Sequence, residues 1–142
     1  MPTRTAEANW GGSLMEGKGT LSTGSKAFSG PYDWKSRSGE GSTTNPEELL
    51  AAAHAGCFSM ALSHQLAQAG HPPKKIHTTA KVSFEKQTEG FAITKIELTT
   101  EGQVPGIDEK MFQDLANKAK DGCPVSKALK ATPITLKATL GR

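Results

Sequence analysis

The stretch from Leu49 to Pro73 constrains the fold of this chain most, because it contains no Asp, Glu, Lys or Arg. The segment Asn45–Glu48, with the sequence Asn-Pro-Glu-Glu, precedes it and has the features of a helix start. Asn accepts a backbone N–H at the N-cap, Pro fits the first helical position, and the two carboxylates face the positive end of the helix dipole. Gly70 and the prolines after it predict that the helix ends near Ala69. The sequence therefore predicts one long helix that is apolar around most of its axis.

An apolar helix of this length needs cover on every side. A membrane would supply cover, but the run contains His54, His64 and His71 as well as glutamines, so a helix buried in a soluble protein explains it better. The few short strands of one chain do not cover such a helix. Two chains that pool their sheets around two such helices would cover it, and we therefore expect a homodimer and no membrane partner.

Strand and helix patterns on both sides of this helix indicate an α+β fold in a single domain, residues 1–142. Period-two alternation and turn residues predict two hairpins, and helical spacing after Asp108 predicts a second helix that Gly122 ends. Lys26–Thr44 is rich in Gly and Ser, and we expect an irregular or weakly stranded loop there. The predicted elements are strands at 5–10, 19–23, 76–86, 91–99 and 134–140, and helices at 45–69, 108–120 and 123–130.

Composition excludes some classes of function. The net charge is +3, and Lys and Arg are scattered among Asp and Glu without a basic run of the kind that follows phosphates. Only 6% of the residues are aromatic, which leaves few surfaces for base stacking, so we expect no nucleic-acid partner. Residues 1–8 contain no apolar signal segment, and we expect a cytoplasmic location.

The chain contains two cysteines, and they stand in different settings. Cys57 lies inside the long predicted helix, in a protein interior. Cys123 directly precedes Pro124 at the start of the last predicted helix, where free backbone N–H groups stabilise a thiolate. In the cytoplasm, a pair of cysteines is more often catalytic or redox-active than a permanent cross-link. The two residues fit a reactive and a resolving thiol, in either order; taken singly, each also fits a structural role in a core or a turn.

Three other chemistries are open to this sequence. His54 and Cys57 share a helical face and His64 follows two turns later, but structural zinc prefers closely spaced ligand pairs, and no CxxC or HxxxH occurs. A Cys-His hydrolase needs a base that faces the thiol, whereas neighbours three apart on a helix point outward side by side. The glycines beside Glu40 lack the Lys-Ser/Thr of a phosphate loop. We expect His54 to be a hydrogen-bonded interior residue, and we expect no metal and no cofactor.

The segment Thr44–Ser63, which contains Asn-Pro-Glu-Glu-Leu-Leu-Ala-Ala-Ala-His-Ala-Gly-Cys, resembles the signature helix of the OsmC/Ohr peroxidases. Further segments resemble the OsmC branch of that family: Phe91–Ile96, Val104–Asp108, Ala119–Ser126 and, near the N-terminus, Trp10 and Gly17–Thr20. The likeness covers nearly the whole chain, which is identified as a member of this branch.

The resemblance implies a thiol peroxidase without metal or haem, built as an intertwined α+β dimer with antiparallel sheets wrapped around long central helices. It implies Cys57 as the peroxidatic thiol, Cys123 as the resolving thiol, Glu47 as the family's carboxylate and Arg37 as its arginine. The residues around Arg37 are less apolar than the family's own version. The implied substrates are organic hydroperoxides and also hydrogen peroxide. The implied cycle forms a Cys57 sulfenic acid and then a Cys57–Cys123 disulfide, which an external dithiol, for example on a lipoylated protein, reduces.

The implied residues also have physical roles. Cys57 must be a thiolate to attack a peroxide oxygen. Burial alone would raise the pKa of this thiol, and a nearby guanidinium would offset that effect. Glu47 would repel the thiolate, so its useful role is to hold Arg37 in a bidentate pair. Ten residues separate Glu47 from Cys57, which is about 15 Å along a helix. Either the helix breaks early, or Arg37 and Glu47 serve the Cys57 of a second chain, and we predict the second.

Two functions fit this scaffold. The first is a hydroperoxide reductase, for which an apolar pocket around Phe58 and Met60 would favour organic peroxides. The second is a ligand-binding or stress-protective protein without catalysis, in which the cysteines serve structure only.

Overall fold

The computed structural model of the chain describes residues 1–141. Contacts divide the chain into two compact units, Met1–Leu49 and a second unit that begins at Leu50. Each unit contains one three-stranded sheet, and the boundary falls near the start of the longest helix. The α+β class predicted from the sequence is confirmed, and a single domain over residues 1–142 stays a prediction.

The first unit is a small antiparallel sheet followed by one short helix. β1 (Ala6–Gly11), β2 (Lys18–Thr23) and β3 (Ser29–Tyr32) pair in that order, and α1 (Trp34–Ser38) follows. The first predicted hairpin is therefore present. Over residues 26–44 an irregular or weakly stranded loop was expected; the four-residue strand β3 agrees with this, whereas the expectation is wrong where the helix α1 forms. Both elements are too short to show a hydrophobic period in the sequence. Pairing with β2 holds β3 in place, and a capping side chain stabilises the start of α1.

The long helix forms as predicted. α2 runs without a break from Pro46 to Gln68, and the side chain of Asn45 accepts a hydrogen bond from the backbone N–H of Glu48 at 2.8 Å. Gly70, with a φ of 85°, follows the helix in a conformation that glycine adopts at little cost. The alternative of an early break in this helix is therefore wrong. Among the described residues, no helix is long and apolar enough to cross a membrane.

Within the described part of the second unit, the core packs against one side of α2. Phe58, Leu62 and Leu66 are fully buried and belong to the hydrophobic core of the second unit. Burial of apolar surface contributes about 25 cal/mol per Å², so a partner that covers the exposed side of α2 would stabilise the assembly. That opposite side carries exposed small or apolar residues, namely Ala53, Gly56, Met60 and Ala67.

The sheet of the second unit has the strand order β4 (Lys75–Gln87), β5 (Gly90–Gln103) and β6 (Ile134–Gly141). β4 and β5 form the second predicted hairpin. β6 pairs with β5 in parallel, so the expectation of wholly antiparallel sheets is wrong here. The reason lies in the connection: the chain crosses over through two helices after β5 and returns to the same end of the sheet, and parallel pairing requires such a crossover.

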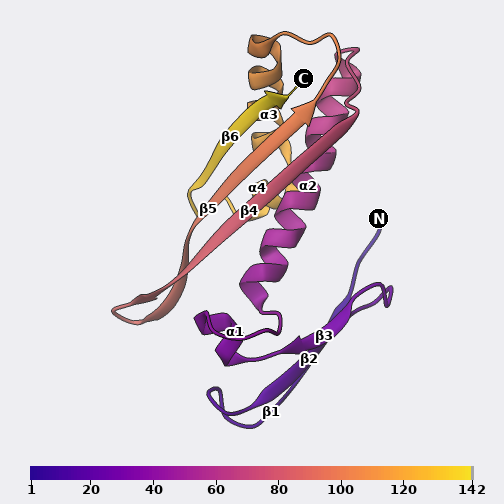
Figure 1. Cartoon of the computed structure of the whole chain (residues 1–142). Coiled ribbons are helices and arrows are strands. Elements are labelled where there is room, and N and C mark those ends of the chain that lie inside the picture. Colours follow the sequence, from indigo (N-terminus) through magenta and orange to yellow (C-terminus); the bar gives the residue numbers. More distant parts are fainter. Residues whose placement is uncertain (142) are drawn as a thin grey trace. The chain divides into compact units, whose positions relative to one another are not determined.

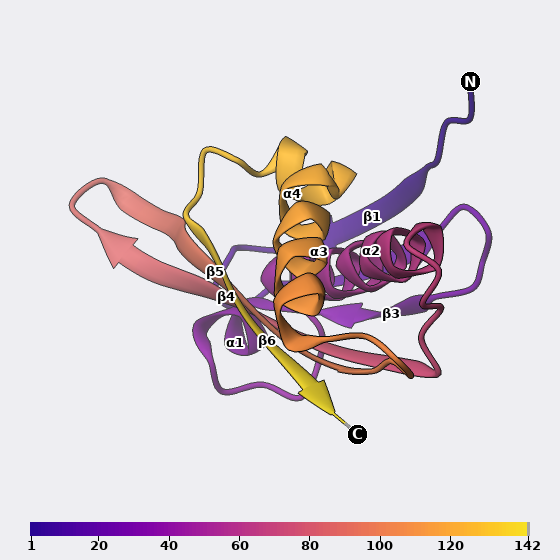
Figure 2. The same ribbon diagram turned by 90° about the horizontal axis from the view of Figure 1, so that it is seen from above.

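The two crossover helices, α3 (Glu109–Gly122) and α4 (Pro124–Ala128), lie on the same face of this sheet as α2 (Figures 1 and 2). Asp108 caps α3 as predicted, because its side chain accepts from the backbone N–H of Met111 at 2.7 Å. α4 forms at the predicted place and is shorter than expected. Apolar residues of α2, α3 and β5 fill the core between helices and sheet.

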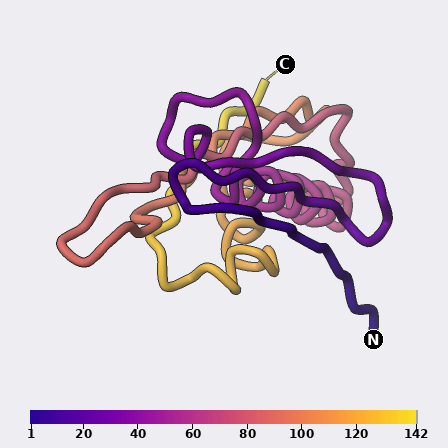
Figure 3. The backbone as a smooth tube through the Cα atoms, turned by 90° about the horizontal axis from the view of Figure 1, so that it is seen from below, coloured from indigo at the N-terminus to yellow at the C-terminus, as the bar shows by residue number. Residues whose placement is uncertain are grey.

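The β4–β5 hairpin is longer than the helices that cover it. Its tip extends beyond them as a loop (Figures 1 and 3). Phe84 and Phe91 stack near the tip, with their ring centroids 5.1 Å apart. This stacking contributes to holding the tip together where the helices no longer cover it.

Candidate active site

The two cysteines lie side by side, although 66 positions separate them in the sequence. The Sγ atoms of Cys57 and Cys123 are 2.8 Å apart, and both thiols are free. α2 carries Cys57 in its middle, and Cys123 stands at the corner where α3 ends and α4 begins. The packing of that corner beside α2 therefore creates a dithiol site.

The exposure of the two thiols corrects the sequence-based view that Cys57 lies in the interior. Cys123 is fully buried, whereas Cys57 is half-buried and lines a groove. The reason is that Gly56 and Met60, on either side of Cys57, lie on the exposed side of α2. Cys57 is thus the thiol that a small molecule reaches from solvent.

The free backbone N–H groups at the start of α4 act on Cys57 rather than on Cys123. Cys123 occupies the N-cap position, but its side chain makes no capping hydrogen bond. The backbone N–H of Val125, in the first turn of α4, donates a hydrogen bond to Cys57 that lowers its pKa. The expectation that this helix start serves Cys123 is therefore corrected, because the Cys123 side chain turns toward α2 instead of capping its own helix.

The remaining surroundings of Cys57 favour the protonated thiol. Burial raises the pKa of Cys57, and the hydrogen bond with Cys123 raises it further, while the Val125 N–H offsets only part of the rise. A protonated thiol is a poor nucleophile. Among the described residues that line the groove, none is Lys or Arg. The described lining of the groove therefore gives access to the Cys57 sulfur but contains no Lys or Arg to stabilise a thiolate.

The groove beside Cys57 has a volume of about 580 Å³ and a mostly apolar wall. Met60 follows Cys57 along α2, and Ala119 and Pro124 line the groove from the corner of α3 and α4. The expected apolar pocket is therefore present around Met60. The expectation is wrong for Phe58, which is fully buried in the core. One residue step turns a helix by about 100°, so the neighbour of Cys57 in the sequence lies on a different face.

In the first unit, Arg37 and Glu47 form a bidentate ion pair. Arg37 Nε donates to one carboxylate oxygen of Glu47 at 3.0 Å, and Nη2 donates to the other at 2.9 Å. Glu47 is 6% exposed, and the Arg37 side chain keeps 35% of its surface exposed. The expected pairing is present, and it fixes one orientation of a partly exposed guanidinium. The catalytic role of the pair stays a prediction.

Local hydrogen bonds place Arg37 opposite Glu47. Asp33 caps α1 by accepting from the backbone N–H of Ser36 at 2.8 Å. Asn45 Nδ2 donates to the hydroxyl of the buried Ser36 at 3.1 Å. Asn45 therefore caps α2 with its oxygen and holds α1 with its nitrogen. This double use ties the helix that carries Arg37 to the helix that carries Glu47.

Arg37 also lines a groove of about 240 Å³ within the first unit. An arginine in a mostly apolar groove suits a ligand that combines a polar oxygen group with an organic part. The apolar and aromatic lining residues of this groove are Trp10, Leu14, Tyr32, Trp34 and Pro46.

A second contact joins α2 and α4 beside the thiols. His54 Nε2 lies 2.7 Å from Ser126 Oγ, and the two residues are 0% and 5% exposed. Burial lowers the pKa of His54, which keeps its ring neutral at neutral pH. The expectation of a hydrogen-bonded interior histidine is confirmed. Sequence reasoning misses Ser126, although a signal exists: His54 and Ser126 each lie three residues from a cysteine.

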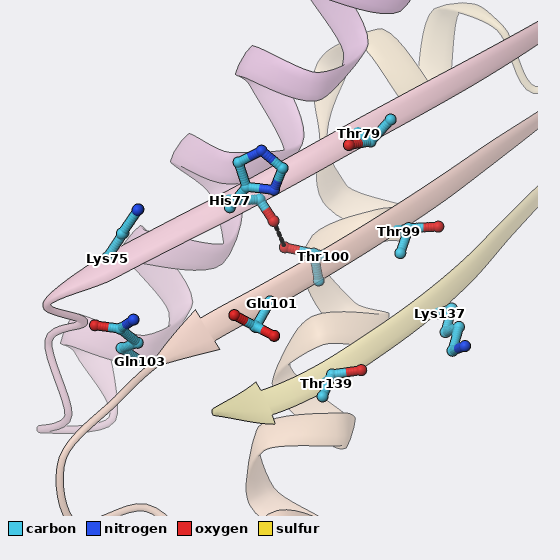
Figure 4. Close-up of a pocket in the computed structure, with 9 residues that line it drawn as sticks. All are labelled: Lys75, His77, Thr79, Thr99, Thr100, Glu101, Gln103, Lys137 and Thr139. Atoms are coloured by element: carbon cyan, nitrogen blue, oxygen red, sulfur yellow. Dashed lines mark hydrogen bonds between the residues drawn. The ribbon is translucent and has the colours of Figure 1, made fainter. Parts of the chain in front are cut away.

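A polar hollow of about 390 Å³ lies on the other face of the second sheet (Figure 4). Its lining comes from all three strands, and Figure 4 shows Lys75 and Lys137 on opposite sides of it with Glu101 between them. Neither cysteine lines this hollow. Side chains of a strand alternate between faces, and Thr78, which bonds Ser59 of α2, marks the face toward the helices. The thiol chemistry therefore belongs to the helix side of the sheet.

Comparisons with known proteins show which family the chain resembles. The sequence pattern of the family described as OsmC-like protein matches residues 39–138. The chain is 52% identical to the Escherichia coli protein named Peroxiredoxin OsmC over 129 residues, which cover 90% of each protein. It is 37% identical over 89 residues to the Organic hydroperoxide resistance protein of Xanthomonas axonopodis pv. citri, covering 62% of this chain and 61% of that protein.

A solved structure shares the fold over nearly the whole chain. It is that of an organic hydroperoxide resistance protein from Elizabethkingia anophelis, with a TM-score of 0.75 and 26% sequence identity. The match covers 99% of this chain and 98% of that chain. The arrangement of elements seen here is thus found in a protein with a hydroperoxide-related name.

Proposed function

The chain belongs to the OsmC-like protein family, and from this premise we propose that it is a cysteine-based hydroperoxide reductase that reacts through Cys57 and Cys123. The observation that carries the proposal is the 2.8 Å separation of the two sulfurs. Free thiols this close need only a small movement to form a disulfide, whose S–S bond is about 2.05 Å long. Relatives named peroxiredoxin and organic hydroperoxide resistance protein support a thiol-dependent peroxidase as the enzyme class.

The cycle begins when the Cys57 thiolate attacks the terminal oxygen of a hydroperoxide. The O–O bond breaks, an S–O bond forms, and the alkoxide takes up a proton and leaves as an alcohol, or as water when the substrate is hydrogen peroxide. Cys57 is now a sulfenic acid. The Cys123 thiol attacks its sulfur, the S–O bond breaks, and hydroxide leaves as water with the thiol's proton. An external dithiol then reduces the disulfide by exchange.

Arg37 supplies the positive charge that the groove beside Cys57 does not. Its guanidinium offsets the raised pKa of Cys57 and stabilises the departing alkoxide, while Glu47 fixes its orientation. α2 is unbroken between Glu47 and Cys57, and ten residues of helix span about 15 Å. This spacing supports a site in which Arg37 and Glu47 of one chain serve Cys57 of a second chain.

We infer from this spacing an intertwined homodimer, in which residues 1–142 act as one domain. The uncovered side of α2 supports this assembly, because its residues near Cys57 are small or apolar. A side chain added at Gly56 would meet no atom within 4 Å, so this surface has room for another helix close to the thiol. A second chain packed there completes the groove beside Cys57.

The reductant in this proposal is an external dithiol, for which a lipoylated protein is one example. Each turnover leaves a disulfide, and a dithiol removes it without remaining bound as a mixed disulfide. A reducing compartment such as the cytoplasm keeps dithiols available. The apolar wall around Met60 supports organic hydroperoxides as the preferred substrates.

Thiol titration before and after one equivalent of cumene hydroperoxide tests the proposed function. We expect both thiols to disappear and an intramolecular disulfide to form that dithiothreitol reduces. The alternative, a ligand-binding or stress-protective protein without catalysis, requires that the two thiols remain unchanged.

Replacement of Cys123 by Ser is expected to preserve the first chemical step and block the second. The Cys123→Ser chain should reduce one peroxide and then stall as the Cys57 sulfenic acid, which further peroxide oxidises to the sulfinic acid. Mass spectrometry of the peroxide-treated variant measures the added oxygen atoms. Sustained turnover equal to that of the wild type would remove Cys123 from the cycle.

A further inference from the structure

We propose that His54 and Ser126 are positioning residues, whose hydrogen bond holds the first turn of α4 against α2 so that Cys123 can attack Cys57 in the step that forms the disulfide. The inference rests on the proposed function of the two cysteines. It assigns a role to a buried pair of side chains that neither react nor reach the groove.

Residues at the start of α4, from its N-cap onward, contact α2 at three points. Cys123 Sγ lies 2.8 Å from Cys57 Sγ, the Val125 N–H bonds the same sulfur, and Ser126 Oγ lies 2.7 Å from His54 Nε2. The first two contacts involve the sulfur that gains and loses oxygen during the cycle. The contact between His54 and Ser126 does not, so it persists while Cys57 changes its chemical state.

The contact between His54 and Ser126 also sets the position of Cys123 relative to Cys57. Residues three apart lie on the same side of a helix, and such a spacing separates His54 from Cys57 on α2 and Cys123 from Ser126 at the start of α4. Two pairs with the same spacing face each other, so holding one pair also sets the position of the other. α4 has five residues, and a helix of this length depends on its contacts for its orientation.

The same pair does not have the features of a nucleophilic Ser-His dyad. Such a dyad needs a carboxylate on the second ring nitrogen and access for a substrate. Among the described residues, His54 Nδ1 is buried without a hydrogen-bond partner, and Ser126 is nearly inaccessible. A buried unpaired nitrogen is unfavourable, so an apolar residue of similar size would fit this core better if packing were the only need. The hydrogen bond between Nε2 and Ser126 Oγ is what a histidine adds here.

The variant Ser126→Ala tests the proposal in a reaction that needs no peroxide. With one equivalent of dithiodipyridine, the Cys57 thiolate displaces one thiopyridone and forms a mixed disulfide. Cys123 then attacks the Cys57 sulfur, displaces the second thiopyridone and forms the Cys57–Cys123 disulfide. The rate of the second release therefore measures how well Cys123 is placed. We expect S126A to slow the second release about tenfold and the first release less than about threefold, the scale of one lost hydrogen bond.

Ser59→Ala is the matched control. Ser59 also lies on α2, and its hydroxyl donates to Thr78 Oγ1 of β4 at 2.8 Å, so S59A removes a similar bond on the sheet side. Both variants should lower the thermal unfolding midpoint by similar amounts, but S59A should release the second thiopyridone at the wild-type rate. His54→Gln, whose side-chain amide can still form a hydrogen bond with Ser126, should stay closer to the wild type than His54→Leu.

A wild-type rate of second release in S126A, or an equal slowing in S59A, would overturn the positioning role. A parallel measurement with cumene hydroperoxide separates this inference from the proposed function. There, S126A should accumulate Cys57 sulfenic acid that dimedone traps. If peroxide leaves the wild-type thiols unchanged while S126A still slows the second thiopyridone release, the proposed function fails and the positioning role stands.

Discussion

Replacement of Cys57 by Ser is expected to abolish hydroperoxide reduction, with a loss on the order of 10⁴-fold or more, the scale at which other enzymes respond to removal of their nucleophile. The serine hydroxyl stays protonated at neutral pH and is a far weaker nucleophile than a thiolate. Serine is close to cysteine in size, so the fold should be retained, which circular dichroism checks. Consumption of cumene hydroperoxide in the presence of excess dithiothreitol measures the loss.

Single-turnover kinetics distinguish the two thiols. Cys57 lines the groove and Cys123 is fully buried, so the first oxygen transfer should occur at Cys57. We expect a burst of one peroxide per chain in Cys123→Ser and none in Cys57→Ser. The opposite pattern would exchange the roles assigned to the two residues.

Mixed dimers of Cys57→Ser chains with Glu47→Ala chains are expected to recover activity that both parent dimers have largely lost. If Arg37 and Glu47 of one chain serve Cys57 of the other, one site of the mixed dimer contains all three residues intact. The mixed dimer should therefore show roughly half the wild-type activity. The Glu47→Ala dimer should lose about a hundredfold, because a guanidinium that has lost its orientation no longer meets the reacting atoms correctly. Dimers with a different affinity tag on each chain can be purified through both tags and assayed.

Glu48→Ala is the matched control for the carboxylate. Glu48 occupies the same first turn of α2 and is exposed, and its carboxylate accepts a hydrogen bond from Thr44 Oγ1 at 2.8 Å rather than from Arg37. Both carboxylates face the helix dipole, so a general effect on helix stability would appear in both variants. Glu48→Ala dimers should keep near wild-type activity. A mixed Cys57→Ser and Glu47→Ala dimer as inactive as its parents would contradict the shared site and would assign Glu47 to the thiol of its own chain.

The elements that sequence analysis predicted correctly are those that depend on neighbouring residues. Asn45 and Asp108 cap α2 and α3 because a side-chain oxygen meets free N–H groups within three positions. α1 was not predicted, and β3 was expected only as a weak strand without bounds, since their residues carry no hydrophobic period. Their structure comes from pairing with β2 and from the hydrogen bonds of Asp33 and Ser36.

The parallel pairing of β6 and the burial of Phe58 also depend on segments that lie far apart in the sequence. The strand pattern of residues 134–140 gives a strand but not its direction in the sheet, which the crossover through α3 and α4 decides. The apolar character of Phe58 is visible in the sequence, but the face on which it lies depends on how α2 packs against the sheet.

The sequence by itself indicated the candidate residues: a thiol in a long, mostly uncharged helix, a second thiol before a proline, and an arginine and a glutamate in motifs that resemble those of the family. Only the tertiary structure decided that Cys57 is the accessible thiol, that the sulfurs lie 2.8 Å apart, and that His54 meets Ser126 across 72 positions. The physical reason is that neighbouring residues set the period and the ends of a helix. The face that one helix presents to another depends on close packing of a core to which distant segments contribute.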